Sequence, residues 1–162
     1  MANYIDITSY ILKGGILTLE VYVATIIFSI PLGILGALIK VSSLKILSKA
    51  VDIYTWLFRG TPLLLQLFFT YFGLPIIGIR LSPFAAAALT FSLNYGAYFT
   101  EIFRSGIQSI DKGQYEAAKV LGMSYRQTMS KIILPQAFKR IIPPMCNEGI
   151  TLIKDTALLA AI

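Results

Sequence analysis

Three long stretches without a charged residue limit what this chain can fold into. Residues 21–39, 60–79 and 81–100 run for 19, 20 and 20 residues without Asp, Glu, Lys or Arg. A helix needs about 20 apolar residues to cross roughly 30 Å of hydrocarbon. Hydrophobic residues make up 56% of the 162 residues, which is more apolar surface than a soluble domain of this size can bury. The sequence therefore predicts an all-α, polytopic membrane protein, not a soluble enzyme, a disordered tail or a secreted disulfide scaffold.

We expect four membrane-spanning segments in a single domain, at residues 15–39, 50–79, 82–103 and 131–162. The second is expected to break near residues 60–62, because Pro62 disfavours helical geometry at Thr61. Gly33 and Gly36 give the first segment a smooth face suited to close helix packing. The fourth segment carries Glu148, Lys154 and Asp155 within residues 141–162, so it is expected to face protein or water and not lipid.

The basic residues predict the orientation of these segments. Eleven of the 14 Lys and Arg residues fall within residues 40–59 and 104–140. Cytoplasmic connections are rich in Lys and Arg, so the N-terminus is expected outside and the loop 104–130 in the cytoplasm of a multi-pass inner-membrane protein. The net charge of +6 then reflects this topology, and no nucleic-acid partner is expected. Residues 1–12 contain no basic residue, so a cleaved signal peptide is not expected.

The side-chain inventory also restricts the chemistry. The chain has no histidine, and Cys146 is its single cysteine, so imidazole catalysis, most zinc sites and an intrachain disulfide are excluded. No nucleophile–base pair or set of metal ligands is recognisable. We expect neither an enzyme nor a metal site.

The loop 104–130 has the pattern of two short helices around a glycine turn. Asp111 is a cap for the first helix, with Gln114 as its capping-box partner, and Gly122 is a natural stop. Ser124 and Gln127 form a second capping box, and the second helix is expected to run to about Leu134, where Pro135 disturbs it. A DNA-reading helix-turn-helix and a purely structural hairpin share this pattern. The DNA-reading alternative is disfavoured, because membrane segments flank the loop closely.

Polar residues inside the expected spans mark a candidate pathway, because burying them in a membrane is costly. Asn94, Tyr98 and Glu101 lie at i, i+4 and i+7, and Glu148 and Asp155 are also seven residues apart. Lys154 and Gln66 complete the candidate set. Structural alternatives stay open: Glu148, Lys154 and Asp155 pair with one another, Glu101 pairs with Arg104, and the tyrosines serve packing.

Fixed spacings in the loop and spans resemble a known family. Glu116, Ala117 and Ala118, then Gly122, then Ile132, Leu134 and Pro135 match the E-A-A-x-x-x-G-x9-I-x-L-P signature of bacterial ABC-importer permeases. Three further stretches look like marks of the polar amino acid subfamily, of the histidine, glutamine or arginine type: Arg59-Gly60-Thr61-Pro62-Leu63, Glu101-Ile102-Phe103-Arg104-Ser105-Gly106 and Ile153-Lys154-Asp155-Thr156. The resemblance covers essentially the whole chain.

The resemblance implies a type I ABC importer permease fold and a set of partners. The permease would pair with a second copy or a paralogue, bind two ABC ATPase subunits, and receive its amino-acid substrate from an extracytoplasmic solute-binding protein. Glu116, Ala117, Ala118, Leu121 and Gly122 would form a coupling helix seated in the ATPase. The chain has no G-x-x-x-x-G-K-[ST] stretch, so ATP would bind the partner subunit and no cofactor would bind here.

An amino acid carries an ammonium and a carboxylate, which the acidic residues and the donors Lys154, Asn94 or Tyr98 can match. The family has one more membrane helix after the position of Ile162, so we expect a permease fold that lacks its last helix. The alternatives are a truncated, non-transporting membrane subunit and a membrane-anchored helix-turn-helix regulator.

Overall fold

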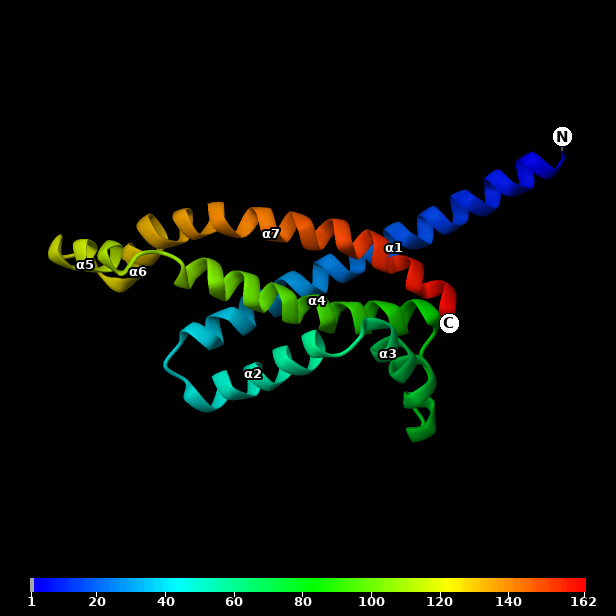
Figure 1. Cartoon of the computed structure of the whole chain (residues 1–162), viewed down its shortest axis with the longest axis horizontal. Coiled ribbons are helices and arrows are strands. Elements are labelled where there is room, and N and C mark those ends of the chain that lie inside the picture. Colours follow the sequence, from blue (N-terminus) through cyan, green and yellow to red (C-terminus); the bar gives the residue numbers. More distant parts are fainter. Residues whose placement is uncertain (1) are drawn as a thin grey trace.

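The computed structural model describes residues 2–162, and every regular element in that range is a helix. In chain order the α-helices are α1 (Ala2–Val41), α2 (Lys45–Gly60), α3 (Leu63–Phe68), α4 (Pro83–Gln108), α5 (Lys112–Val120), α6 (Tyr125–Thr128) and α7 (Leu134–Asp155). Short π or 3-10 segments complete the chain: η1 (Phe69–Gly73), η2 (Leu74–Ile77), η3 (Met129–Ile133) and η4 (Thr156–Ala161). The expected all-α helix bundle is therefore observed (Figure 1).

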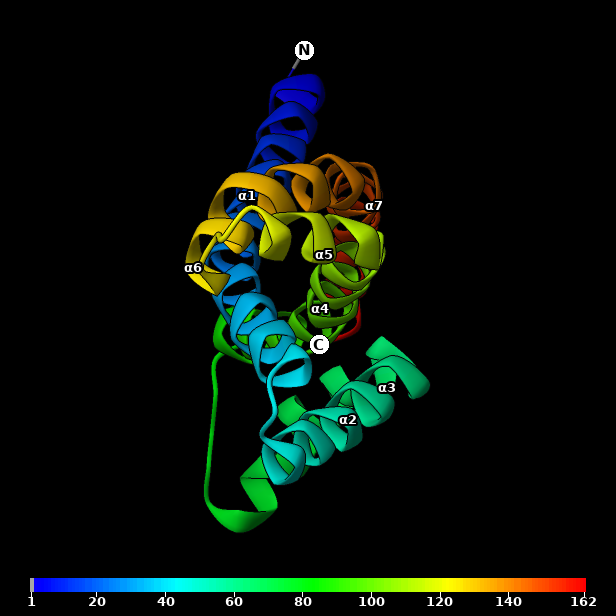
Figure 2. The ribbon, with the colours of Figure 1, turned by 90° about the vertical axis from the view of Figure 1, so that its left-hand side faces the viewer.

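The long helices lie along one axis. Helices α4 and α7 run side by side, and α1 crosses α4 over the most extensive interhelical contact of the bundle (Figure 1). Helices α5 and α6 lie at the end where α1 turns into α2, and they face the viewer in Figure 2. The two connections rich in Lys and Arg are thus at the same end, as they must be if both face one side of a membrane. Which side that is stays a prediction.

Helix α4 is the centre of the core. Phe91, Tyr95 and Phe99 on α4 are almost completely buried, together with Val21 on α1 and Leu152 on α7. Apolar side chains on three different helices therefore share one cluster, and their removal from solvent holds the bundle together.

Glycines let α1 and α4 approach closely, as the sequence predicted. A Cβ atom added at Gly33 would lie 2.5 Å from Cβ of Phe99, and one added at Gly36 would overlap the Thr100 side chain. Gly96 and Gly106 on α4 are equally tight, against Leu32 and Ile141. The close crossing of α1, α4 and α7 therefore requires glycine at these positions, because a larger residue would collide with the neighbouring helix.

The second predicted segment is broken as expected, and the break is sharp. Helix α2 ends at Gly60, Thr61 is extended with φ −117° and ψ 146°, and α3 begins after Pro62. The helical axis bends by 103° between Lys45–Gly60 and Leu63–Ile77. Pro62 explains the site of the bend, because it forces Thr61 out of helical geometry.

Segment lengths differ from the prediction at several ends. Helix α1 starts at Ala2, not near residue 15, and its first half extends beyond the other helices (Figure 1). In the described chain, Ile7–Val41 is long and apolar enough to cross a membrane, and the bent pair α2 with Leu63–Ile77 also qualifies when counted as one span. Helices α4 and α7 match the other two expected segments and are less apolar, because they carry the polar residues described below.

The loop between α4 and α7 folds much as its pattern predicted. The Asp111 side chain caps α5 by accepting from the Gly113 N–H at 2.6 Å, although Gln114 does not complete a box there. Gly122 adopts φ +71°, a left-handed conformation that favours glycine. Ser124 and Gln127 form the expected capping box at α6.

The second helix of the loop does not stop before Pro135. It passes through the π-helical turn η3 directly into α7, because Pro135 lacks the N–H that would continue the α-helical ladder. Helix α6 is only four residues long, so the loop offers no separate recognition helix of the kind that reads DNA.

Gly36→Val tests the close crossing of α1 and α4. The added side chain has no room against Thr100, so we expect the free energy of unfolding to fall by about 1–3 kcal/mol. The measurement is thermal unfolding of the purified protein in detergent. Gly14→Val is the matched control on the same helix, because no atom lies within 4 Å of a Cβ added there. Equal losses for both variants would contradict the packing argument.

Candidate functional site

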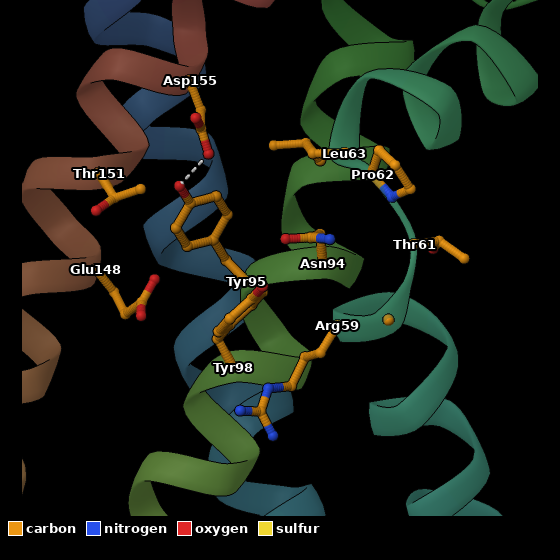
Figure 3. A pocket seen from close by; sticks show the side chains of 11 residues that line it. Arg59, Thr61, Pro62, Leu63, Asn94, Tyr95, Tyr98, Glu148, Thr151 and Asp155 are labelled. Carbon is orange, nitrogen blue, oxygen red and sulfur yellow. Dashed lines mark hydrogen bonds between the residues drawn. The ribbon is translucent and has the colours of Figure 1, made fainter.

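A pocket of about 430 Å³ opens where the broken helix meets α4 and α7. It is lined by Arg59, Gly60, Thr61, Pro62, Leu63, Asn94, Tyr95, Tyr98, Glu148, Thr151 and Asp155. The residues come from three parts of the chain, which Figure 3 shows around one space: the α2–α3 break, the middle of α4, and the last turns of α7. We call this space the break pocket.

Opposite charges face one another across the break pocket. Glu148 and Asp155 project from α7 on one side, and Arg59 projects from α2 on the other (Figure 3). The Tyr95 hydroxyl donates to Oδ2 of Asp155 at 2.6 Å, which fixes that carboxylate. The Arg59 guanidinium lies over the Tyr98 ring, 5.1 Å from its centroid, in a cation–π contact. Separated charges of both signs suit a ligand that is itself a zwitterion.

Two amide side chains hold the break in place. The Gln66 Nε2 donates to the carbonyl of Phe58 at 2.9 Å and to the Thr61 hydroxyl at 2.7 Å. The Asn94 Nδ2 donates to the same Phe58 carbonyl at 2.8 Å and to Oε1 of Gln66 at 3.0 Å. A helix that ends inside a bundle leaves its last carbonyls without partners. The Gln66 and Asn94 amides donate hydrogen bonds to the Phe58 carbonyl at this end, and because Asn94 belongs to α4, they tie the break to α4.

Four of the seven predicted pathway residues line the break pocket: Asn94, Tyr98, Glu148 and Asp155. Gln66 lies beside it and is used in the hydrogen bonds that hold the break. Lys154 is exposed and forms no ion pair among residues 7–162, whose side chains the structure describes. The structural alternative in which Glu148, Lys154 and Asp155 pair with one another is therefore not observed, since Asp155 bonds to Tyr95 instead.

Glu101 lies apart from the pocket, in a second polar cluster. Its carboxylate pairs with Arg104 at 2.6 Å, as the structural alternative proposed, and also with Lys40 of α1. The seven-residue spacing placed Glu101 on the same helical face as Asn94 and Tyr98, but Glu101 lies about one turn further along α4 than Tyr98 and is bound there by Lys40 and Arg104.

Seven of the residues that line the break pocket were absent from the predicted pathway. Five of them form the stretch Arg59-Gly60-Thr61-Pro62-Leu63, which was expected only as a family mark and a helix break, and the other two are Tyr95 and Thr151. Arg59 could have been predicted from its position directly before the charge-free run that contains Gly60 and Pro62. A charged side chain beside an expected helix break has free space to point into. The burial of Tyr95 against Asp155 had no local signal.

Helix α5 divides its residues between two surroundings. Ala117, Leu121 and the neighbouring Val120 are exposed, Val120 at 88% and Leu121 at 76%. Ala118 is fully buried inside the chain, so the expectation that it contacts a partner is wrong. The small side chain of Ala118 lets α5 pack closely against the bundle, and its burial indicates this packing role.

The remaining motif residues lie outside the break pocket. Glu116 is exposed on α5, and Leu134 and Pro135 start α7 after the π-helical turn. Burial of Tyr115 against the bundle raises the pKa of its phenol, and Tyr125 adds to this effect, so the ring stays neutral and packs as an aromatic. No cluster of three or more metal-ligating side chains occurs in the described part of the chain.

Comparison with known proteins gives consistent similarities. The family described as "Binding-protein-dependent transport system inner membrane component" matches residues 29–162. The arginine transport system permease protein ArtQ of Bacillus subtilis is 47% identical over 154 residues, which are 94% of this chain and 70% of that protein. The L-cystine transport system permease protein TcyB of the same organism is 43% identical over 94% of this chain and 65% of its own length.

A solved structure shares the fold. The chain superposes on a protein described as "Crystal structure of an amino acid ABC transporter with histidines" with a TM-score of 0.91 at 36% identity. The match covers 99% of this chain and 75% of that one.

Gln66→Leu tests whether the two amides hold the break. The change leaves the Phe58 and Thr61 groups with fewer partners, so we expect the free energy of unfolding to fall by about 1–3 kcal/mol. Thermal unfolding in detergent measures this loss. Gln114→Leu is the control, because the Gln114 side chain accepts a single exposed hydrogen bond at 3.2 Å and we expect about 0.5 kcal/mol or less. A loss no larger than that of the control would refute the assigned role.

Proposed function

The chain belongs to the binding-protein-dependent transport system inner membrane components, and from this premise we propose that it is the permease subunit of an ATP-driven importer of polar amino acids. In this proposal the break pocket holds the amino acid during passage, and α5 receives the movement of the ATPase subunits. The observation that carries the proposal is the arrangement of charges of both signs around one pocket at a helix break.

The pocket matches the groups that all amino acids share. The Arg59 guanidinium is a bidentate donor of the kind that binds a carboxylate, and Asp155 or Glu148 is an acceptor for an α-ammonium. The Asp155 carboxylate is pre-positioned by Tyr95, so less ordering is needed when the ligand binds. A ligand seated between Arg59 and α7 would therefore meet both of its backbone charges.

The charge balance favours a polar side chain. Two carboxylates and one guanidinium leave the pocket with an excess of one formal negative charge, which a neutral zwitterion does not compensate. A cationic side chain would. The names of the relatives refer to glutamine, arginine and L-cystine, so they support a polar amino acid, whereas the preference for a cation rests on the charges of the pocket alone.

Helix α5 is suited to couple the chain to an ATPase subunit. It is seated on the bundle through the buried Ala118 and stopped by the left-handed Gly122. Its outer face presents Glu116, Ala117 and Leu121 to a partner. An apolar face fixed on a short, capped helix transmits a push from the partner into α4 and α7. A second copy or a paralogue and an extracytoplasmic solute-binding protein complete the proposed assembly.

Binding of amino acids tests the proposed substrate. The complex, purified with its ATPase subunits, is titrated with the twenty amino acids by isothermal calorimetry. We expect L-arginine or another polar amino acid to bind, and Arg59→Met to weaken that binding at least tenfold by removing the carboxylate partner. Arg80→Met, a cation in the connection before α4 and outside the pocket, is the control and should bind as the original chain does. Binding of apolar amino acids alone would contradict the proposal.

Site-specific cross-linking tests the coupling role of α5. In a Cys146→Ser background, Ala117→Cys is expected to join the ATPase subunit on treatment with a short bifunctional reagent, because residue 117 is exposed. Ala118→Cys is the matched control, since residue 118 is fully buried in this chain and should give at least tenfold less product. The absence of any product at residue 117 in the assembled complex would count against α5 as the contact.

A further inference from the structure

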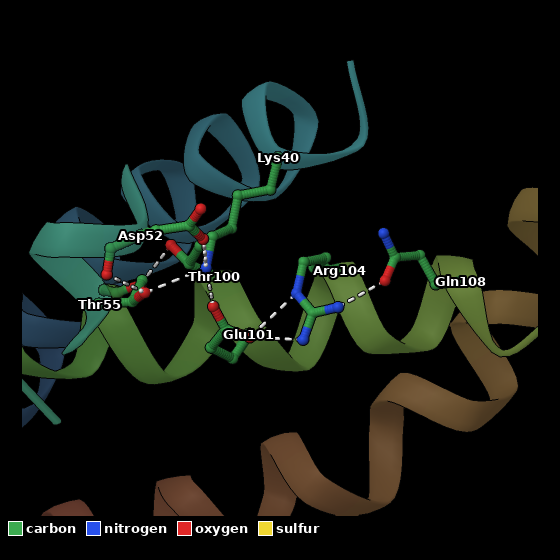
Figure 4. A network of polar contacts seen from close by, with 8 residues as sticks. Lys40, Asp52, Thr55, Thr100, Glu101, Arg104 and Gln108 are labelled. Carbon is green, nitrogen blue, oxygen red and sulfur yellow. Dashed lines mark hydrogen bonds and ion pairs between the residues drawn. The ribbon is translucent and has the colours of Figure 1, made fainter. Parts of the chain in front are cut away.

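A buried lysine joins three helices outside the break pocket. Lys40, at the end of α1, has a side chain that is 7% exposed. Its Nζ contacts Oδ1 of Asp52 at 2.7 Å and Oγ1 of Thr55 at 3.1 Å, both on α2, and it pairs with the Glu101 carboxylate on α4. Figure 4 shows Lys40 at the point where these helices meet.

In this arrangement each hydrogen of the Lys40 ammonium has an acceptor. An ammonium has three hydrogens to donate, and Asp52, Thr55 and Glu101 are three acceptors. Glu101 is in turn shared with Arg104, so two cations and two carboxylates form one neutral network. A buried charge that lost its partners would be strongly unfavourable, so the network holds α1, α2 and α4 in one fixed arrangement.

The same face of α2 carries this network and the pocket cation. Asp52, Thr55 and Arg59 are spaced by three and four residues, which places them on one side of the helix. Residues 52 and 59 are about 10 Å apart along the helix axis, which is two turns. On α4, Tyr98 and Glu101 are likewise three residues apart. Two parallel contacts therefore join α2 to α4, an ionic one at Lys40 and a cation–π one at Arg59.

Arg59 itself has little else to hold it. Among residues 7–162 it forms no ion pair, and its guanidinium contacts the Tyr98 ring. The location of its guanidinium therefore depends on how α2 lies against α4. A small rotation of α2 about its axis would carry Arg59 away from the pocket.

We propose that Lys40 is a positioning residue for the break pocket: by binding Asp52 and Thr55 of α2 and Glu101 of α4 at once, it sets the rotation of α2 and so places Arg59 for the substrate carboxylate. This inference deepens the proposed function and depends on it for the identity of the ligand. Lys40 does not touch the ligand.

The test uses the whole complex in proteoliposomes with radiolabelled L-arginine as the probe. For Lys40→Met we expect the KM for L-arginine to rise about fivefold with kcat within twofold, because Arg59 is misplaced while α5 is untouched. Glu101 keeps Arg104 in this variant, so no buried carboxylate is left alone. Asp52→Asn, which removes only the charge on α2, should shift KM in the same direction, and Lys40→Arg should restore most of the affinity.

A second measurement does not need a substrate. Hydrogen–deuterium exchange of the same complexes should show exchange of α2 at least threefold faster in Lys40→Met and Asp52→Asn. Lys49→Met is the matched control, since Lys49 is an exposed cation on α2 with no ion pair in the described chain, and it should change neither KM nor exchange.

The outcomes separate the two proposals. If no amino acid is transported but α2 exchanges faster in both variants, the proposed substrate fails and the positioning of α2 by Lys40 is supported. An unchanged KM together with unchanged exchange of α2, or a loss of assembled complex at constant KM, would overturn the inference.

Discussion

Polar groups inside this bundle have to find partners within the protein, because a hydrocarbon environment offers them no water. Helix α4 supplies many of these polar groups. Its inward face presents Asn94 to the break, Tyr95 to Asp155 of α7, and Glu101 to Lys40 of α1. Each of these contacts joins α4 to a different element. The requirement to pair buried polar groups therefore fixes how the other helices lie around α4, and apolar packing then fills the space between them.

The helix break shows how this requirement creates a site. Pro62 ends α2 at an exposed position beside α4, and the carbonyls that it frees are bound by Gln66 and Asn94. The break can then stay open without a loss of hydrogen bonding. Because α3 turns away by 103°, the chain leaves a pocket beside Arg59.

Three small hydroxyls are buried without a hydrogen-bond partner in the described chain: those of Thr25, Ser29 and Ser92. Their small side chains let the helices pack closely, although each unpaired hydroxyl costs free energy.

Local signals predicted much of the fold. Charge-free runs predicted the helical bundle, Pro62 predicted the bend, and Gly122, Ser124 and Gln127 predicted the geometry of the loop. These signals are local because each reports a backbone preference or a solvent preference of a few neighbouring residues. Helix ends were predicted less well, since α1 and the passage from α6 into α7 are decided by packing and by the π-helical turn rather than by a cap.

The sequence by itself determined that the chain is an all-α membrane bundle with a broken helix, a capped loop rich in Lys and Arg and the signature of an importer permease, because these follow from hydropathy, turn chemistry and fixed spacing. Only the tertiary structure decided which polar residues share a space. Helical spacing grouped Glu101 with Asn94 and Tyr98, yet the crossing of α1 and α2 took Glu101 to Lys40 and brought Arg59 to the pocket instead. The packing of α5 on the bundle likewise buries Ala118 and leaves Ala117 exposed. Periodicity places residues on a face of one helix, whereas the neighbour that this face meets depends on how the helices pack.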